Sequence, residues 1–286
     1  MKRAAFREVV ENERPLVMAG AFDALSARLI ERAGFPSYFI SGFSVVGARY
    51  GVPDIGLKGL GDISAAVRDI VRATDLPVLV DGDDGYGDVK NVVETVHTYE
   101  RMGVGAIMLE DQTWPKRCGH MAGKNVVPVE VMEAKLRAAV SERLNPDTFI
   151  IARTDSRAVH GLDDALRRAE RYLNTGVDGL FIEAPESVEE LEIIGKSFDV
   201  PQLANPLEGG RTPILSPKEL HELGFRIIPY GITLILRAAK AMQLALEDIR
   251  SGKFALWNTG VSFDEYKEIV GFSKWSRVDD QYGLSR

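Results

Sequence analysis

The chain has 286 residues but only one cysteine, Cys118. A single cysteine excludes an intramolecular disulfide and is typical of a reducing compartment, so we expect a cytoplasmic protein. The longest apolar runs, such as residues 77–80 and 232–236, are far too short to cross a membrane. The first residues lack the apolar core of a secretory signal. These absences predict a protein without a membrane partner.

A basic stretch is also missing, and the formal net charge is −7. This charge argues against nucleic acid as the main partner. Hydrophobic residues make up 45% and charged residues 27% of the chain, as in ordinary globular proteins. The composition therefore favours a protein that handles a small-molecule ligand.

Short apolar runs with β propensity recur along the chain, and each is followed by an amphipathic, helical pattern. They are residues 16–19, 38–41, 78–83, 106–110, 149–155, 180–184, 202–205 and 226–230. Eight such units in one chain predict an α/β fold, a (β/α)8 TIM barrel, and we expect residues 1–286 to form one domain. No Gly-x-Gly-x-x-Gly turn follows the first run, which disfavours a dinucleotide-binding sheet. Residues 251–286 follow the complete barrel and are predicted to form a C-terminal helical extension that packs on a neighbouring subunit.

Polar residues end six of the predicted strands. In a (β/α)8 barrel the carboxyl ends of the strands meet at one rim, where active sites lie. Polar residues follow buried strands in many proteins because the chain leaves the core there. Six polar strand ends on one rim nevertheless indicate an active site. They are Ser41-Gly42, Asp81-Gly82-Asp83, Glu110-Asp111-Gln112, Arg153-Thr154-Asp155, Glu183 and Asn205.

Carboxylates at this rim predict a metal site. Strand alternation sends Asp81 and Asp83 to the same face, and Glu110 follows the next strand. Two neighbouring carboxylates repel each other unless a cation lies between them. An all-oxygen set suits Mg²⁺ or Mn²⁺. The alternative is a pair of solvated turn carboxylates. Asp54, on the loop after the second strand, can join the same cluster.

A second set of residues is suited to a substrate carboxylate. The backbone N–H groups around Ser41, Gly42 and Phe43 can donate to it, and Arg153 can hold it with two parallel hydrogen bonds. The alternative for Arg153 is an ion pair with Asp155 or Glu183 alone.

Cys118 lies in a long connection, residues 112–127, between the fourth strand and its helix. Lys116-Arg117 precede the thiol and Gly119-His120 follow it. Positive neighbours tune the pKa of a thiol, and glycine admits a ligand, so this setting favours chemistry over the alternative of a small buried hydrophobe. Long barrel loops of this kind are often active-site lids. We expect this one to close over the metal site.

The same motifs resemble, in order and spacing, the isocitrate lyase/phosphoenolpyruvate mutase superfamily over residues 4–280. Those that carry the resemblance are Asp81-Gly-Asp83, Glu110-Asp-Gln112, Pro115-Lys-Arg-Cys-Gly-His120, Ala152-Arg-Thr-Asp155, Glu183-Ala-Pro185 and Ala204-Asn-x-x-Glu-Gly-Gly-x-Thr-Pro213. The Lys-Arg-Cys-Gly-His motif is typical of the carbon–carbon lyase branches.

This resemblance implies a (β/α)8 barrel whose last helix is swapped between the subunits of a homotetramer. It implies Mg²⁺ near Asp83, with Asp81 and Glu110 reaching it through water, and Mn²⁺ as a substitute. Cys118 is the implied catalytic acid. The catalytic set that we predict also contains Lys116, Arg117, His120 and Asp54. The base stays open between Asp54 and a metal-bound water.

The Glu208-Gly209-Gly210 form and the residues around Trp114 look more like the dimethylmalate and petal-death lyases than like methylisocitrate lyases. Leu234 stands where an additional carboxylate-binding arginine is expected in the latter. We therefore predict a lyase that cleaves a substituted malate, such as 2,3-dimethylmalate, into a 2-oxo acid and a carboxylic acid. The residues predicted to bind the substrate are Ser41, Gly42, Phe43, Arg153, Gly119, Glu183 and Asn205.

Four alternatives stay open. Three are activities of the same superfamily: methylisocitrate lyase, carboxyphosphonoenolpyruvate phosphonomutase and oxaloacetate hydrolase. The fourth, of a different class, is a non-catalytic barrel that binds dicarboxylates.

Overall fold

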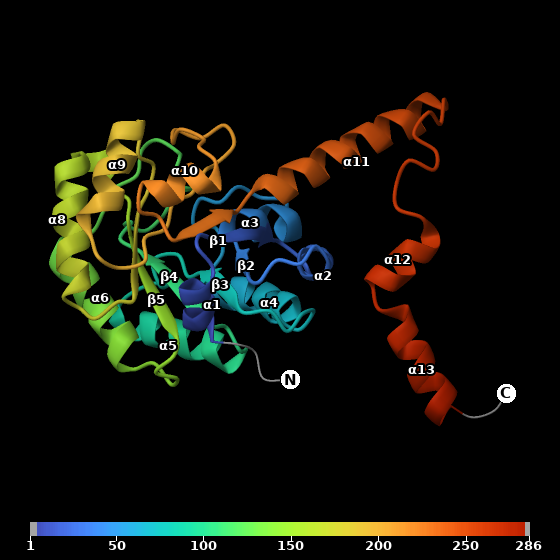
Figure 1. Cartoon of the computed structure of the whole chain (residues 1–286), viewed down its shortest axis with the longest axis horizontal. Coiled ribbons are helices and arrows are strands. Elements are labelled where there is room, and N and C mark those ends of the chain that lie inside the picture. Colours follow the sequence, from blue (N-terminus) through green and yellow to red (C-terminus); the bar gives the residue numbers. More distant parts are fainter. Residues whose placement is uncertain (1–4, 284–286) are drawn as a thin grey trace. The chain divides into compact units, whose positions relative to one another are not determined.

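The computed structural model describes residues 5–283, and the chain divides into two compact units between Leu234 and Ile235. The first unit contains a parallel sheet of seven strands in the order β6-β5-β4-β3-β2-β1-β7, which curls on itself (Figure 1). The strands are β1 Leu16–Ala21, β2 Tyr38–Ile40, β3 Val78–Asp81, β4 Ala106–Glu110, β5 Phe149–Thr154, β6 Gly179–Ile182 and β7 Ile227–Tyr230. The predicted (β/α)8 TIM-type fold is confirmed.

The predicted strand at residues 202–205 is reduced to two isolated parallel bridges. Gln202 pairs with Leu180 of β6, and Leu203 pairs with Ile227 of β7. Proline cannot donate to a strand ladder, and Pro201 and Pro206 flank the segment, so pairing is confined to the residues between them. These bridges lie between the two outermost strands of the sheet, β6 and β7, and so close the barrel.

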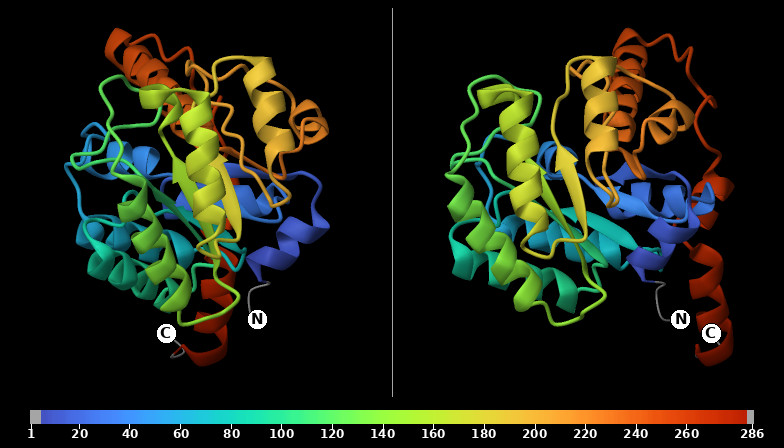
Figure 2. Two further views of the ribbon diagram at one scale, coloured as in Figure 1. Left: turned by 90° about the vertical axis from the view of Figure 1, so that its left-hand side faces the viewer. Right: turned by 60° about the vertical axis from the view of Figure 1, so that its left-hand side comes forward.

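Helices cover the outside of the curled sheet (Figure 2). They are α2 Ala24–Arg32, α3 Gly42–Tyr50, α4 Leu60–Val71, α5 Val89–Arg101, α6 Val129–Ser141, α7 Arg157–His160, α8 Leu162–Leu173, α9 Val188–Ser197 and α10 Pro217–Glu222, whereas α1 Phe6–Asn12 lies at the amino-terminal end of the barrel. Local sequence defines several helix starts. Asp23 accepts a hydrogen bond from the backbone N–H of Ser26, and Ser216 caps α10 with Pro217 in its first turn.

The core has two parts because alternate side chains of each strand face opposite sides of the sheet. The larger part lies between the sheet and the helices. The smaller part includes the barrel interior, where Met18, Leu79 and Ile151 pack together with Phe6 and Val10 of α1. The Phe6 ring packs against Phe149, at the start of β5, with the ring planes tilted by 57° and the centroids 5.7 Å apart. Helix α1 therefore closes the amino-terminal end of the barrel, and the carboxyl end is left for the site.

The second unit holds most of α11 Thr233–Ser251, together with α12 Phe263–Ile269 and α13 Phe272–Tyr282. It begins within α11, before residue 251, where we expected the helical extension to start. Large apolar side chains are exposed along it, among them Trp257 at 71% and Phe263 at 79%. The packing of these helices on a neighbouring subunit stays a prediction. Within residues 5–283, no helix is long and apolar enough to span a membrane.

Candidate active site

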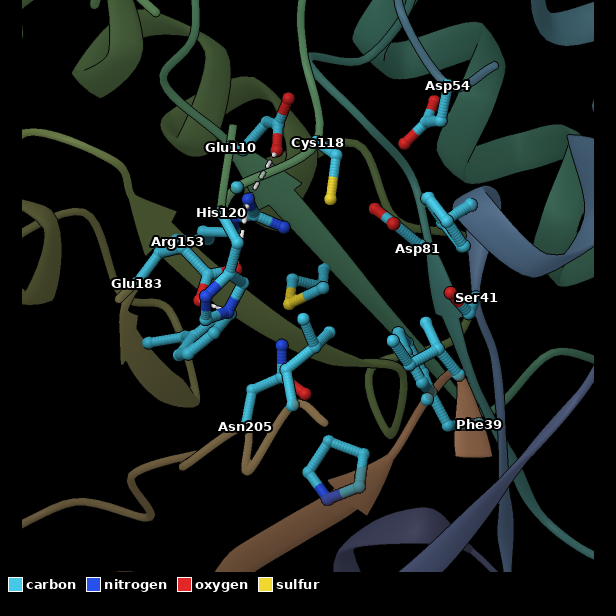
Figure 3. A pocket seen from close by; sticks show the side chains of 18 of the residues that line it. Phe39, Ser41, Asp54, Asp81, Glu110, Cys118, His120, Arg153, Glu183 and Asn205 are labelled. Carbon is cyan, nitrogen blue, oxygen red and sulfur yellow. Dashed lines mark ion pairs between the residues drawn. The ribbon is translucent and has the colours of Figure 1, made fainter. Parts of the chain in front are cut away.

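A pocket opens at the carboxyl ends of the strands. Fifteen residues were predicted for the site, and thirteen of them line this pocket. Eleven come from the first five strands and their loops: Ser41, Phe43, Asp54, Asp81, Glu110, Lys116, Arg117, Cys118, Gly119, His120 and Arg153. The other two, Glu183 and Asn205, come from later segments of the barrel. Figure 3 shows Glu110, Arg153 and Glu183 on one side of this pocket and Asp81 and Ser41 on the other. The polar strand ends thus meet at one rim, as predicted.

With Glu183 and Asn205 included, thirteen of the predicted residues line the pocket, and the other two, Gly42 and Asp83, lie directly beside it. A Cβ atom on Gly42, the first residue of α3, would lie 3.2 Å from Asp81 Oδ2 and 3.4 Å from Asp83 Oδ1. Both carboxylates therefore face the amino-terminal end of α3. A glycine at this position leaves the space between them and the helix open.

Asp83 reaches this position by a different route from the predicted one. We expected β3 to continue to Asp83, but the strand ends at Asp81. Asp83 has a φ of 48°, in the left-handed region that ends an extended strand. Its backbone N–H donates to Asp81 Oδ1 at 3.1 Å, so a tight turn places the two carboxylates together.

Lys116 is the cation of this acidic cluster. Its Nζ atom lies 2.5 Å from Asp54 Oδ1 and 2.6 Å from Asp83 Oδ1, and all three side chains are buried. Burial raises the pKa of Asp83 to about 7, although Lys116 opposes that rise. Burial lowers the pKa of Lys116, but Asp83 and Asp54 outweigh it and hold that pKa well above its usual range. The cluster therefore holds more negative charge than one ammonium group neutralises.

A hard divalent cation fits this excess of carboxylate. Within residues 5–283, no three His, Cys, Asp or Glu side chains are already arranged around a common metal position. Glu110 Oε1 is nevertheless buried without a hydrogen-bond partner, and burial raises the pKa of Glu110 well above its usual range. Such an oxygen is costly unless a cation or water satisfies it. The oxygen donors of Asp81, Asp83 and Glu110 match Mg²⁺ or Mn²⁺.

Arg153, at the end of β5, is surrounded by three carboxylates. Its Nε atom donates to Asp155 Oδ2 at 2.9 Å, and its Nη2 atom lies 3.3 Å from Glu110 and 3.1 Å from Glu183. Burial alone raises the pKa of Glu183, but Arg153 and His120 lower it below its usual range. The ion pairs that the sequence left as an alternative are therefore present, and they hold the guanidinium at the pocket wall (Figure 3).

The loop after β4 is closed at its base and lies over the pocket. Gln112 and Val126 form an antiparallel bridge, and the Gln112 side chain binds the backbone of Arg117 through both amide atoms, at 2.8 and 2.9 Å. The backbone N–H of Cys118 then donates to the Asp54 carbonyl oxygen. These contacts define where Cys118 lies. The Gln112 clamp was not predicted from the sequence.

The Cys118 sulfur points into the pocket, with Glu110 and Arg153 on one side and Asp81 on the other (Figure 3). The side chain is neither fully buried nor exposed. Burial raises the pKa of the thiol to about 11, although the backbone N–H of His120 lowers it. The sulfur is therefore a protonated thiol at neutral pH that faces a cavity, unlike a cysteine packed inside a core.

His120 connects this loop to the segment after residue 204. Its Nδ1 atom accepts a hydrogen bond from the backbone N–H of Arg211 at 3.1 Å, and its Nε2 atom lies 3.2 Å from Glu183. A Cβ atom on Gly210 would come within 2.6 Å of His120 Nδ1. The Glu-Gly-Gly sequence therefore provides the room that this contact requires.

Arg117 differs from its neighbours in the motif. Its side chain is exposed, and its Nη1 atom lies 3.5 Å from the Ala122 carbonyl oxygen. It borders the pocket without entering the acidic cluster, and its catalytic role stays a prediction. Ser41 caps α3 through its backbone only, with its side chain buried at the pocket.

The pocket also has an apolar wall that was not predicted from the sequence. It consists of Phe39, Met108, Phe181, Leu203, Leu207, Pro229 and Ile232. Four of these side chains, from Phe39, Met108, Phe181 and Leu203, also belong to the smaller core cluster that includes the barrel interior. Strand alternation gives a core position and a pocket-lining position the same signal, so the sequence does not separate the two.

Comparisons with known proteins agree with this geometry. The family model described as "Phosphoenolpyruvate phosphomutase" matches residues 6–250. The chain belongs to this family. The resemblance drawn from the motifs, to the isocitrate lyase/phosphoenolpyruvate mutase superfamily, is confirmed.

Two curated relatives match nearly the whole chain. The 2,3-dimethylmalate lyase of Eubacterium barkeri is 40% identical, with 99% of each chain covered. The probable 2-methylisocitrate lyase 2 of Corynebacterium glutamicum is also 40% identical, over 98% of this chain and 92% of that one. The lyase class predicted from the motifs is confirmed by these relatives.

Solved structures also match nearly the whole chain, at lower sequence identity. Oxaloacetate acetylhydrolase in complex with 3,3-difluorooxalacetate superposes with a TM-score of 0.93 at 30% identity, over 98% of this chain and 96% of that one. Phosphonopyruvate hydrolase, solved with oxalate and Mg²⁺, has a TM-score of 0.86 at 28% identity, with 96% and 97% covered. A superfamily relative thus binds Mg²⁺ together with a small dicarboxylate.

Proposed function

We propose that this protein is a Mg²⁺-dependent carbon–carbon lyase that cleaves a substituted malate, of the 2,3-dimethylmalate kind, into a 2-oxo acid and a carboxylic acid. The observation that supports this proposal best is the protonated thiol of Cys118, which points into a pocket lined by Asp81 and Glu110. The match to the Eubacterium barkeri lyase over the full chain favours the same substrate class.

Asp83, Asp81 and Glu110 are the residues that would hold the cation. When bound, Mg²⁺ supplies Lewis-acid stabilisation of negative charge on the substrate's 2-hydroxyl oxygen. The first turn of α3, at Ser41 and Gly42, lies beside the same carboxylates, and in this proposal its backbone N–H groups donate to the adjacent carboxylate of the substrate.

Cys118 is the proposed acid. Cleavage of the C2–C3 bond leaves its electron pair on C3, as the enolate of the departing carboxylic acid. The Sγ–H group donates its proton to that carbon, which forms a C–H bond and leaves a thiolate on Cys118. A thiol whose pKa is about 11 can do so because the enolate of a carboxylate is far more basic.

Arg153, His120 and Glu183 lie beside the departing fragment in this proposal. The guanidinium lies 3.1 Å from Glu183, which in turn lies 3.2 Å from His120, so the three form one connected polar wall. Asn205 and the backbone of Gly119 complete that wall. Preorganised donors of this kind stabilise charge as it develops. Asp54 is the group on this chain that we propose to take the proton of the 2-hydroxyl group.

The apolar wall favours alkyl substituents over a further carboxylate. Leu207 and Ile232 line the pocket together with Phe43, and none of them can pair with a charged group. A methyl group placed against such a wall gains about 0.8 kcal/mol per buried carbon. A carboxylate placed there would be desolvated without a partner.

The test is a substrate panel. We expect kcat/KM for release of the 2-oxo acid from 2,3-dimethylmalate to exceed that for methylisocitrate by more than about tenfold, because one unpaired buried charge costs at least that much. Faster cleavage of methylisocitrate would contradict the substrate assignment. Release of oxalate from oxaloacetate, or turnover of a phosphonate, without any cleavage of malates would replace the lyase proposal by one of the other superfamily activities.

We also propose that the protein acts in the cytoplasm as a homotetramer, assembled through the apolar side chains of the second unit. Trp257 and Phe263 are more than two-thirds exposed in a single chain. Exposed aromatic side chains in such number are typical of an interface. Light scattering after gel filtration measures the subunit number, and a monomeric mass would contradict the assembly.

A further inference from the structure

We propose that Lys124 is a positioning residue that fastens the loop carrying Cys118 to the barrel, and so holds the thiol over the pocket. Its effect on turnover rests on the proposed lyase function. Its effect on where the loop lies does not.

The contacts of Lys124 join two parts of the fold. Its side chain is 2% exposed, and its Nζ atom donates to Asp155 Oδ1 at 2.7 Å. The same Nζ atom donates to the backbone carbonyl oxygen of Gly119, the residue after Cys118. One ammonium group thus ties the backbone beside the thiol to a carboxylate at the end of β5.

Asp155 is a suitable anchor because the barrel holds it from other sides. Its Oδ2 atom accepts from Arg153 Nε at 2.9 Å, and its backbone N–H donates to Asp111 Oδ1 at 2.9 Å. Asp111 is itself fully buried and accepts hydrogen bonds from Thr154 and Tyr172. A loop bound to Asp155 is therefore bound to a rigid part of the molecule.

The closed position leaves no space between the loop and the catalytic wall. A Cβ atom on Gly119 would overlap both Arg153 Nη2 and Glu183 Oε2. The backbone at Gly119 is therefore in direct contact with the groups that line the pocket. The hydrogen bond from Lys124 to the Gly119 carbonyl oxygen holds the loop at this contact.

Lys135 offers a matched comparison. It is another buried lysine whose Nζ atom donates to a backbone carbonyl oxygen, that of Asp84 at 2.9 Å. It belongs to α6, however, and within the described residues no hydrogen bond or ion pair joins its side chain to residues 116–124. A purely structural role for Lys124 would make the two lysines equivalent. A positioning role predicts that loss of Lys124 exposes Cys118, whereas loss of Lys135 does not.

The experiment measures access to Cys118. It is the only cysteine of the chain, so the rate of iodoacetamide addition, followed by intact mass, reports this one thiol. We expect alkylation of the ligand-free Lys124→Met variant to be at least about tenfold faster than that of wild type, because a freed loop exposes the sulfur. Gly119→Ala, which removes no charge, should accelerate it similarly. Lys124→Arg should stay within about threefold of wild type, and Lys135→Met within about twofold.

The rates are repeated in low urea to separate loop opening from global unfolding. A local opening exposes little surface and is nearly independent of urea, whereas global unfolding is steeply dependent on it. A Lys124→Met rate within twofold of wild type overturns the proposal. So does an acceleration shared equally with Lys135→Met. Lys124→Gln is measured in the same way should the methionine variant not fold.

Turnover supplies the second readout. In Lys124→Met we expect kcat to fall at least about tenfold with KM within about threefold, and Lys124→Arg to restore most of kcat, because a misplaced acid affects proton transfer more than binding. An equal loss of kcat in Lys124→Met and Lys124→Arg would contradict a positioning role. A wild-type enzyme that cleaves no malate would refute the proposed function, while the alkylation rates would still decide the role of Lys124.

Discussion

The backbone N–H of Cys118 donates a hydrogen bond to the carbonyl oxygen of Asp54 at 3.2 Å. The Asp54 side chain also pairs with Lys116, two residues earlier on the same loop, at 2.5 Å. The loop after β4 is thus bound twice to the segment after α3. Because backbone and neighbouring side chains make these contacts, the position of the sulfur does not depend on the thiol itself.

Replacement of Cys118 by serine therefore tests chemistry without moving the loop. We expect kcat to fall by about 10²–10⁴-fold, because an alcohol is a far weaker acid than a thiol and a positioned acid contributes about that much. KM and the thermal unfolding midpoint should change little. Steady-state kinetics on the best malate substrate measure the effect. Turnover equal to that of wild type would remove Cys118 from the mechanism.

The pH dependence of Cys118 alkylation is a separate prediction. Burial raises the pKa of the thiol to about 11, so the neutral form is favoured and the thiolate appears only as the pH approaches that value. We expect the rate at pH 8 to be on the order of 100-fold lower than in the same chain unfolded in urea, where a thiol has a pKa near 8.5. The rate should rise with pH up to at least pH 10. A plateau near pH 8 would show an activated thiolate instead.

Chelation tests the carboxylates at the ends of β3 and β4. We expect EDTA to abolish activity, Mg²⁺ to restore it fully and Mn²⁺ to restore it in part, because both ions suit an all-oxygen site. Asp83→Asn should weaken Mg²⁺ binding, measured by calorimetry, by at least about tenfold through loss of one carboxylate charge. Asp75→Asn, at an exposed loop position, is the control. Full activity in a chelated sample would refute the metal assignment.

Asp155→Ala should destabilise the fold. The substitution leaves the buried Arg153 and Lys124 without their shared carboxylate, and breaking a buried pair in this way costs about 3–5 kcal/mol. Urea unfolding measures the loss, and Asp75→Ala should cost less than about 0.5 kcal/mol.

The ion pairs of Asp155 with Arg153 and Lys124 also predict how the loss of stability in Asp155→Ala varies with pH. Burial alone raises the pKa of Asp155, but Arg153 and Lys124 outweigh burial and lower it to about 2, below the 3.8 of an ordinary aspartate. Its contribution to stability is therefore complete above about pH 4 and is lost as the pH falls towards 2. The difference in unfolding free energy between wild type and Asp155→Ala should shrink from pH 5 to pH 3. A constant difference would mean that Asp155 is not stabilised as a carboxylate.

Most of the strands and the rim of the site could be predicted from the sequence because both depend on local patterns. Short apolar runs separated by amphipathic stretches specify a parallel barrel, and polar residues at strand ends then fall on one rim. Strand boundaries were less predictable. β3 ends at Asp81 because Asp83 adopts a left-handed conformation, and that choice depends on the turn around it.

The directions of loop side chains could not be predicted. Lys116, Arg117 and Cys118 are consecutive, yet the first is buried in an acidic cluster, the second is exposed and the third points into the pocket. No periodicity governs an irregular loop, so contacts with distant residues decide each orientation. The contact between Lys124 and Asp155, 31 positions apart, has no local signal either.

By itself, the amino-acid order determined the class of fold, the superfamily and the chemical types gathered at one end of the barrel, since periodicity and short motifs carry that information. The pairing of the charges, the burial of the thiol and the choice of the lysine that binds the loop depend on the folded molecule. Those properties arise from distances between segments far apart in the chain, and burial then sets the energy of each charge.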